Sequence, residues 1–359
     1  RIKYIMAYTT VNKSSSFMNP KLYTGNSSAR TISGVGFQPD FTWLKVRDGA
    51  TAHFLFDVLR GPLYRIQSNS SNTSVSAANT LTAWNSDGFA LGTENDTNNN
   101  SYSYASWNWK ANGAGSSNTA GSINSTVSVN TTAGFSICKW TGSGANATIG
   151  HGLGAVPKMI IVKNTSTTDS WMVYHVGMGN NAYMHLDTNN GALSPSTNQF
   201  QATTPTSSLF YVGTADGTNK SSSTMIAYCF ADIQGYSKFG SYVGLGGTNY
   251  PFIYTGFKPA FVMAKRTNST SNWVMYDNKR QYNNIEGQYN PQRPRLASNL
   301  SAAESSFTSD NGVDLLSNGF VVRDNSDDAY TINISGSTYI YMAFGQSIVG
   351  SNNIPATAR

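Results

Sequence analysis

Carboxylate pairs are the first requirement of hydrolytic chemistry, and this chain contains few carboxylates. Asp and Glu together number 18 among 359 residues. A glycosidase places two carboxyl groups within about 5–10 Å of each other, whereas Glu94, Glu286 and Glu304 stand in unrelated sequence contexts. The Glu-x-Asp-x-Glu arrangement of some jelly-roll glucanases is absent. We therefore expect no catalytic residue and no enzyme activity.

The histidines offer no better starting point for catalysis. They are His53, His151, His175 and His185. Residues 149–154 surround His151 with glycines, but they lack the lysine and the following helix that a phosphate-binding loop requires. We interpret this run as a tight turn. His175 follows a repeated aromatic position, so we interpret it as structural.

Metal sites and disulfides are only weakly indicated. A calcium site needs clustered oxygen ligands, and residues 94–96 and 324–328 could supply them, but both segments are typical of solvated turns. Cys138 and Cys229 each lie in a strand-like run. They are either buried free thiols, which we favour, or a disulfide that joins the first and last strands of one unit. We expect no metal and no cofactor.

An internal repeat is the strongest pattern in the chain, and repeats should be settled before function. A Gly-x-x-Pro begins each copy, a Lys follows the Pro by six residues, and an aromatic residue follows it by 17. The aromatic of an aromatic-x-Gly precedes the Pro by 16 or 17 residues. The members are Pro39, Pro157 and Pro259; Lys45, Lys163 and Lys265; Phe56, Tyr174 and Tyr276; and Gly25, Gly142 and Gly244.

The copied residues are of types that build strands and cores. The Pro suits a strand entry, where its missing N–H costs nothing. We expect the Lys to be a charge at a sheet edge or on a solvent face. Two copies carry a Trp eight residues after the Lys, Trp171 and Trp273, where the first copy has His53. We expect these Trp residues and the later aromatics to fill the core between sheets, with ligand stacking as the alternative.

Hydrophobic alternation predicts the fold class. Short runs of β-branched and aromatic residues are punctuated by Gly, Asn and Asp. We predict an all-β protein of tandem β-sandwich or jelly-roll repeats, about three units of roughly 100 residues. The units are residues 23–110, 129–234 and 235–348, with a linker at 111–128 and a tail at 349–359. Because the linker is rich in Gly and Ser, we expect units 2 and 3 to pack together and unit 1 to be held more loosely.

The N-terminal segment resembles the last strand of a unit. Residues 4–8 are similar to residues 339–344 and 225–230, which leaves four closing strands for three units. Residues 1–22 are therefore either the end of an upstream unit, which we favour, or a strand that pairs with another subunit. Residue 1 is Arg, so we expect the chain to be a piece of a longer protein.

Composition narrows the function classes further. Charged residues make up 12% of the chain, and the net charge of +6 comes without a run of like charges. This argues against a nucleic-acid partner. No apolar run reaches the ~20 residues that a membrane span needs, so we expect no membrane insertion. Asn, Ser, Thr and Gly replace the charges, as is typical of extracellular or virion β-proteins.

Several runs resemble a recurrent module of tailed-phage virion proteins that is common in marine viral sequences. They are residues 133–137, 235–244, 251–252, 256–260, 316–320 and 339–344, and the resemblance covers about residues 33–346. It implies concanavalin A-like lectin sandwiches in tail-fibre or other structural proteins. It offers no catalytic residue to carry over, and fold analogy alone cannot supply one.

The leading hypothesis is a virion structural protein at the particle surface, a tail-fibre or spike component with lectin-like modules that bind the host surface. Its expected partners are other virion subunits, in a homo-oligomer, and a host glycan or receptor; no ligand-binding residue is singled out. The alternative is an architectural capsid decoration or filament subunit without a receptor role. A polysaccharide depolymerase is a third hypothesis, for which no carboxylate pair can be named.

Overall fold

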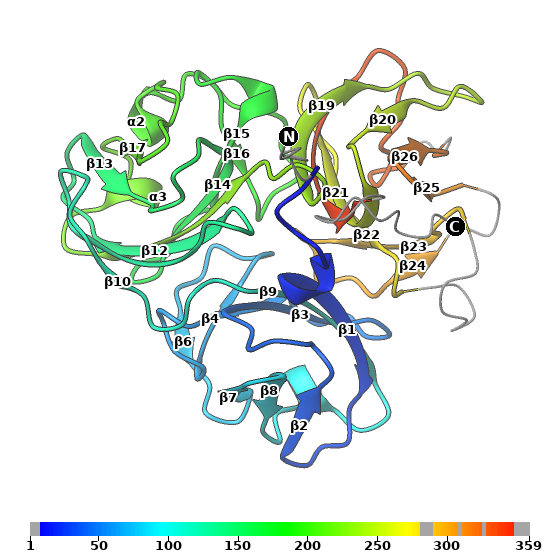
Figure 1. Cartoon of the computed structure of the whole chain (residues 1–359), viewed down its shortest axis with the longest axis horizontal. Coiled ribbons are helices and arrows are strands. Elements are labelled where there is room, and N and C mark those ends of the chain that lie inside the picture. Colours follow the sequence, from blue (N-terminus) through cyan, green and yellow to red (C-terminus); the bar gives the residue numbers. More distant parts are fainter. Residues whose placement is uncertain (1–7, 281–289, 307–310, 325–327, 348–359) are drawn as a thin grey trace, which may run out of the picture.

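The computed structural model describes residues 8–280, 290–306, 311–324 and 328–347. Nearly all regular structure in these residues is antiparallel β-sheet, so the prediction of an all-β sandwich fold is confirmed. Figure 1 shows three lobes, blue to cyan, green, and yellow to red, arranged around a common centre. Within the described part of the chain, no helix is long and apolar enough to cross a membrane.

Each lobe is built on one large sheet. Unit 1 has the order β1 (Met18–Thr24), β9 (Ser103–Trp109), β3 (Phe41–Val46), β4 (Phe54–Asp57), β5 (Tyr64–Gln67) and β6 (Val75–Ser76). Unit 2 has β10 (Ser116–Asn118), β11 (Ser125–Asn130), β12 (Phe135–Thr141), β18 (Thr224–Ala231), β14 (Pro157–Asn164), β15 (Met172–His175) and β16 (Met184–His185). Unit 3 has β19 (Ser237–Val243), β27 (Thr338–Gln346), β21 (Lys258–Arg266), β22 (Val274–Asp277), β23 (Pro294–Ala297) and β24 (Ser305–Ser306).

A small sheet covers one face of each large sheet. The small sheets are β2 (Arg30–Ser33), β8 (Gly88–Leu91) and β7 (Leu81–Asn85) in unit 1; β13 (Ala147–Gly150) and β17 (Leu209–Val212) in unit 2; and β20 (Phe252–Tyr254), β26 (Gly319–Val322) and β25 (Val313–Leu316) in unit 3. The described helices are single turns: η1 (Ser14–Ser16), α1 (Asn95–Asn98), η2 (Val176–Met178), α2 (Thr197–Phe200) and α3 (Asp216–Asn219). Each unit is therefore a two-layer sandwich.

The repeated prolines begin equivalent strands. Pro39 lies two residues before β3, Pro157 is the first residue of β14, and Pro259 is the second of β21. In β14 and β21 the register shifts directly after the Pro, a bulge that tolerates a residue without an N–H. The Gly three residues earlier has a left-handed backbone in all three copies, with φ of 91°, 69° and 82°.

The aromatic-x-Gly glycines mark a close approach of two backbones. A side chain at Gly25, Gly142 or Gly244 would collide with the carbonyl of Asn99, Lys220 or Ile334, respectively, in the turn that precedes the last strand of the same unit. Glycine is the only residue that allows this contact. The repeat thus fixes where β1, β12 and β19 meet the last strands of their units.

Alternate residues of the central strands pack into two different hydrophobic cores. In β3, Leu44 and Val46 point into the core of unit 1, whereas Phe41 and Trp43 point into a core shared by all three units. β14 and β21 divide in the same way between their own units and the shared core. Period-two alternation of apolar residues on both faces produces this division. The three large sheets therefore enclose one central core.

Three equivalent aromatic residues meet in the shared core. Trp109, Phe230 and Phe344 come from the last strands of units 1, 2 and 3, and their ring centroids lie 5.8–6.3 Å apart. Aromatic pairs in such geometries add about 0.5–1.5 kcal/mol beyond the burial of their area. The expectation that unit 1 is held more loosely is therefore wrong, because its tryptophans lie inside the common core.

Two predicted boundary segments belong to sheets. β1 pairs with β9 along its whole length, so residues 18–22 are part of unit 1 rather than of a separate N-terminal strand. The predicted linker at 111–128 contains β10 and the start of β11, which pair with each other and with β12. Short polar residues hid β10 and the start of β11 in the sequence. The strand predicted around residues 4–8 lies almost entirely outside the described residues, as does the tail at 349–359.

Candidate functional site

The junctions between units are built from one repeated structural position. β4, β15 and β22 end at Asp57, His175 and Asp277, which occupy equivalent places opposite the strand that follows the Pro. Each of these side chains is buried and makes a hydrogen bond to a neighbouring unit. The contacts of this position run around the centre: Asp57 of unit 1 contacts unit 2, His175 of unit 2 contacts unit 3, and Asp277 of unit 3 contacts unit 1.

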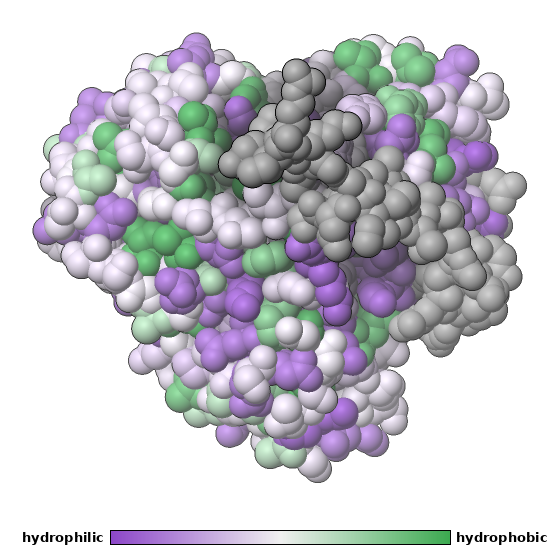
Figure 2. Space-filling view, viewed as in Figure 1, coloured by the Kyte–Doolittle hydropathy of each residue, from purple (hydrophilic) through white to green (hydrophobic). Residues whose placement is uncertain are grey.

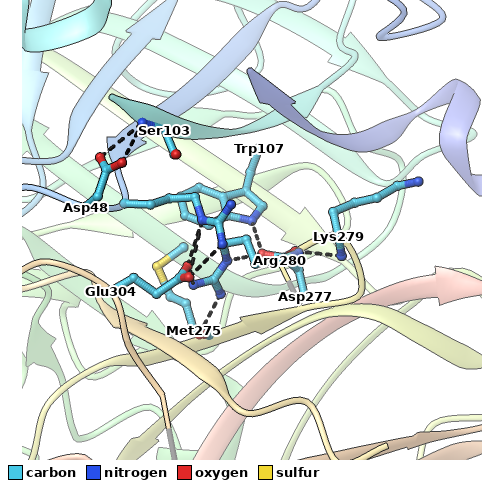
Figure 3. A network of polar contacts seen from close by, with 9 residues as sticks. Asp48, Ser103, Trp107, Met275, Asp277, Lys279, Arg280 and Glu304 are labelled. Atoms are coloured by element: carbon cyan, nitrogen blue, oxygen red, sulfur yellow. Dashed lines mark hydrogen bonds and ion pairs between the residues drawn. The ribbon is translucent and has the colours of Figure 1, made fainter. Parts of the chain in front are cut away.

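Units 1 and 3 are joined by a buried charged network. Trp107 of unit 1 donates its indole N–H to Asp277 Oδ2 at 2.9 Å, and Arg280 Nε lies 2.6 Å from the same oxygen. Arg280 also contacts Glu304, which pairs with Arg47 of unit 1 at 2.8 Å (Figure 3). Burial alone would raise the pKa of Asp277, but Arg280 outweighs it and holds the pKa below its usual value.

Units 1 and 2 repeat this arrangement. Tyr228 of unit 2 donates its hydroxyl to Asp57 Oδ2 at 2.7 Å, and Arg60 Nε lies 2.6 Å from the same oxygen. Burial and the neighbouring carboxylate raise the pKa of Tyr228 well above its usual value, so the phenol stays protonated and remains a donor. Arg60 and Arg280 both follow their aspartate by three residues.

Units 2 and 3 meet through a neutral histidine. His175 Nδ1 accepts from the Gly177 N–H at 3.0 Å, which leaves Nε2 as the donor to the Tyr341 carbonyl at 3.0 Å. Burial lowers the pKa of His175 to about 4. Met178 stands where the other units have an arginine, and Met342 stands where they have Trp107 and Tyr228. At this junction the aspartate, the arginine and the hydrogen-bond donor of the neighbouring unit are therefore all replaced.

In units 2 and 3, the repeated Trp position makes a second set of contacts between units. Trp171 donates to the Gln67 carbonyl of unit 1, and Trp273 donates to the His185 carbonyl of unit 2, both at 2.9 Å. In unit 1, His53 replaces Trp and accepts from Trp43 at 2.9 Å. Burial holds the pKa of His53 well below its usual value. The expectation that the Trp residues fill a core is confirmed, and that core lies between units.

The prediction that the repeated lysines are surface charges is wrong. Lys45, Lys163 and Lys265 are all fully buried, and each donates from Nζ to the carbonyl of the next residue at 2.7–2.9 Å. Lys163 also reaches Ser71 of unit 1, and Lys265 reaches Asn189 of unit 2. Burial lowers the pKa to about 8 for Lys45 and Lys163 and to about 7 for Lys265. Carbonyl groups from loops satisfy the ammonium, which sequence spacing cannot reveal.

The remaining candidate residues have structural partners. His151 Nδ1 accepts from the Leu153 N–H within its own turn, as expected for a tight turn. Asp96 pairs with Arg65, and Asp328 pairs with Arg295. Among the described residues no group of three His, Cys, Asp or Glu side chains could hold a metal ion. Residues 325–327 and Glu286 lie outside the described part of the chain.

Both cysteines are free thiols in the core of unit 2. Cys138 and Cys229 are completely buried. They lie on neighbouring strands, where Cys138 is opposite Ala227 and Cys229 is opposite Ser136. This arrangement agrees with the free-thiol interpretation that the sequence favoured.

A hollow on unit 3 is the best candidate for a binding site. It has a volume of about 440 Å³ and lies between the turn that joins β18 to β19 and the end of β20. Its lining is Tyr8, Asp232, Gln234, Gly235, Ser237, Lys238, Tyr254, Thr255 and Gly256. The Tyr8 hydroxyl donates to the Gly256 carbonyl at 3.0 Å, and Tyr254 is 62% exposed. The hollow thus combines aromatic faces with hydrogen-bonding groups.

The edge strand beside the hollow differs between the units. Each of these edge strands, β2, β13 and β20, has a central isoleucine that lies opposite a phenylalanine of the neighbouring strand in its sheet. The pairs are Ile32 and Phe89, Ile149 and Phe210, and Ile253 and Phe320. The flanking outward residues are Thr31 and Ser33 in unit 1, Thr148 and Gly150 in unit 2, and Phe252 and Tyr254 in unit 3. Phe252, at 50% exposed, and Tyr254 are thus not required by the sandwich. Figure 2 shows apolar residues gathered over the β19–β20 side of the molecule.

The charged pairs at the junctions and the exposed aromatic residues of β20 were not singled out from the sequence, although the sequence contains a signal for each. Asp-x-x-Arg follows the repeated aromatic directly in units 1 and 3, at Asp57 and Asp277. An Asp-x-x-Arg at a repeated place would have indicated paired charges. Phe252 and Tyr254 stand out only once the three edge strands are aligned, and the units differ by one or two residues in that loop.

Comparison with known proteins assigns the chain to one family. A family model described as "Domain of unknown function (DUF7483)" matches residues 13–347, so the chain belongs to this family. No curated protein and no solved structure gives a significant match. A single domain model that covers all three units agrees with their shared central core.

Proposed function

We propose that this protein is a structural protein of a tailed-phage virion, a tail-fibre or spike component that binds the host surface without catalysis. The observation that carries this proposal is the contrast between the junctions, where polar side chains are buried and bonded, and unit 3, where aromatic side chains are exposed. The described polar side chains at the junctions bond to other units, whereas unit 3 presents exposed aromatic residues beside a hollow. Exposed aromatic groups that packing does not require are typical of recognition surfaces.

The shared core of the three units suits a particle surface. Three sandwiches joined by a common core and buried hydrogen bonds resist local opening better than sandwiches on flexible linkers. The proposed partners are further virion subunits, in a homo-oligomer, together with a host glycan or receptor. Several copies on one particle would give avidity from weak individual sites.

Immunogold labelling of the particles tests the structural part of this proposal. Antibodies against the purified chain should decorate the virion surface at one morphological position. Labelled protein should also adsorb to susceptible cells and compete with the particles. If the antibodies leave intact particles unlabelled while detecting free protein in the lysate, the virion proposal fails.

An architectural role without receptor binding is the second proposal, and it also has an observation behind it. Val243, Leu245 and Phe252 are each about half exposed, at 53%, 49% and 50%. Such residues would be covered if a neighbouring subunit packs on this side of unit 3. Particles that lack this protein and are misshapen or incompletely assembled, but still adsorb normally to cells, would favour the architectural role.

A further inference from the structure

The hollow on unit 3 has the features of a small-molecule site. Its volume of about 440 Å³ falls in the range of about 300–1,000 Å³ that is typical of ligand pockets. It is assembled from three separate parts of the chain, at Tyr8, at residues 232–238 and at residues 254–256. The Tyr8 bond to Gly256, at 3.0 Å, joins the first part to the third, and the Lys238 bond to Asp232, at 2.9 Å, fixes the second part internally. The cavity is therefore preformed.

The charges that line the hollow balance each other. Asp232 Oδ2 pairs with Lys238 Nζ at 2.9 Å, and Asp232 Oδ1 accepts from the Phe239 N–H at 2.9 Å. Burial and the neighbouring Tyr254 raise the pKa of Tyr8, so its phenol is neutral at physiological pH. A ligand that enters the hollow meets no net charge, which favours an uncharged molecule over an anion or a cation.

The uncharged groups supply both kinds of contact that a sugar ring needs. The exposed ring of Tyr254 offers an apolar face, against which the C–H face of a pyranose can pack. The Ser237 and Thr255 hydroxyls are buried and bonded to backbone groups of their own turns, whereas the exposed amide of Gln234 can both donate and accept hydrogen bonds. The hydroxyls of a neutral sugar have the same dual character.

From this combination we infer that the hollow bounded by Tyr8 and Tyr254 is a binding site for an uncharged pyranose, such as the terminal sugar of a cell-surface glycan. This inference rests on the proposed function, and it names the ligand class and the unit responsible. Units 1 and 2 have small residues at the positions of Phe252 and Tyr254, so only unit 3 is assigned such a site.

Saturation-transfer NMR with the full chain tests the inference. The probes are glucose, galactose, mannose and N-acetylglucosamine, with N-acetylneuraminic acid as the acidic comparison. At least one neutral sugar should bind with millimolar affinity, and Tyr254→Ser should weaken that binding at least tenfold. Tyr64→Ser is the matched control, because Tyr64 is 46% exposed on unit 1 and should leave binding unchanged.

The outcomes separate the site from the function. Binding that survives Tyr254→Ser, stronger binding of the acidic sugar, or no saturation transfer to any sugar each overturns the site. Loss of sugar binding in Tyr254→Ser without loss of cell adsorption would show that this site is not the receptor-binding site, and it would leave the proposed virion function intact. An unchanged thermal unfolding transition establishes that both serine variants are folded.

Discussion

The junction between units 1 and 3 and the junction between units 2 and 3 place different chemistry at the same position. At the first, Asp277 is ionised, pairs with Arg280 and accepts from Trp107. At the second, the neutral ring of His175 donates to a backbone carbonyl. The position therefore requires a buried group that bonds across the junction, and it does not require a charge. Because a buried charge must be paired, the acid and the base are present together or absent together.

Removing one partner of the charged junction should have the largest effect. Asp277→Ala leaves Arg280 buried without its closest counter-charge and the Trp107 N–H without an acceptor. We expect a loss of about 3–5 kcal/mol in the free energy of unfolding, measured by urea denaturation. The control is Asp216→Ala, which breaks an exposed pair with Lys220 and should cost less than about 1 kcal/mol. Equal losses in the two variants would contradict a special role for the junction.

Acid should weaken the neutral junction. Burial lowers the pKa of His175 from 6.5 to about 4, so the unfolded chain binds more protons between these values. The contribution of His175 is fully present above pH 6.5 and is lost as the pH falls to 4, by about 3 kcal/mol at most. His175→Gln keeps a donor that does not titrate and should flatten the pH dependence of unfolding in this window. An unchanged slope would show that His175 is not neutral in the folded state.

Transplanting the neutral junction should sharpen the comparison. Asp57→His alone leaves Arg60 buried and unpaired, so we expect it to be strongly destabilising. Adding Arg60→Met and Tyr228→Met reproduces the residue types found between units 2 and 3, and it should recover about 2 kcal/mol because the three side chains act as one network. Unfolding of the single, double and triple variants gives the coupling energy. A strictly additive set would mean that the residues do not form a unit.

Alkaline pH should relieve the cost of a buried lysine. Burial lowers the pKa of Lys265 from 10.5 to about 7, so the unfolded chain binds more protons throughout that window. The free energy of unfolding should rise with pH, by about 1–2 kcal/mol more between pH 7 and 8.5 than in Lys265→Met. Urea denaturation at each pH measures the difference. Parallel pH profiles would place the charged ammonium in contact with solvent.

The smallest effect is expected on the open face of unit 3. Phe252→Ser removes a half-exposed ring from an edge strand and should change the free energy of unfolding by no more than about 0.5 kcal/mol. Sedimentation of the same variant distinguishes the two proposed roles. A smaller assembly than that of the unaltered chain would indicate that a neighbouring subunit covers Phe252, as the architectural role requires.

Strand positions and core aromatics were predictable from the repeat, whereas the arrangement of the units was not. Pro157 has a local backbone requirement, so its place in the repeat alone predicted the entry of a strand. The burial of Lys163 depends on the Ser71 carbonyl of another unit, and no local pattern carries that information. The candidate binding hollow was likewise invisible, because Tyr8 and Tyr254 lie far apart in the sequence.

The sequence alone determined that the chain is made of strands and where the strand after each repeated Pro begins, because alternation, proline and glycine act on the backbone within a few residues. The tertiary structure decided that three sandwiches share one core, that the repeated lysines are buried, and that one unit keeps an open aromatic face. Those outcomes depend on which carbonyl or carboxylate a neighbouring unit places opposite each side chain, and that placement is set only when the three sheets close on one another.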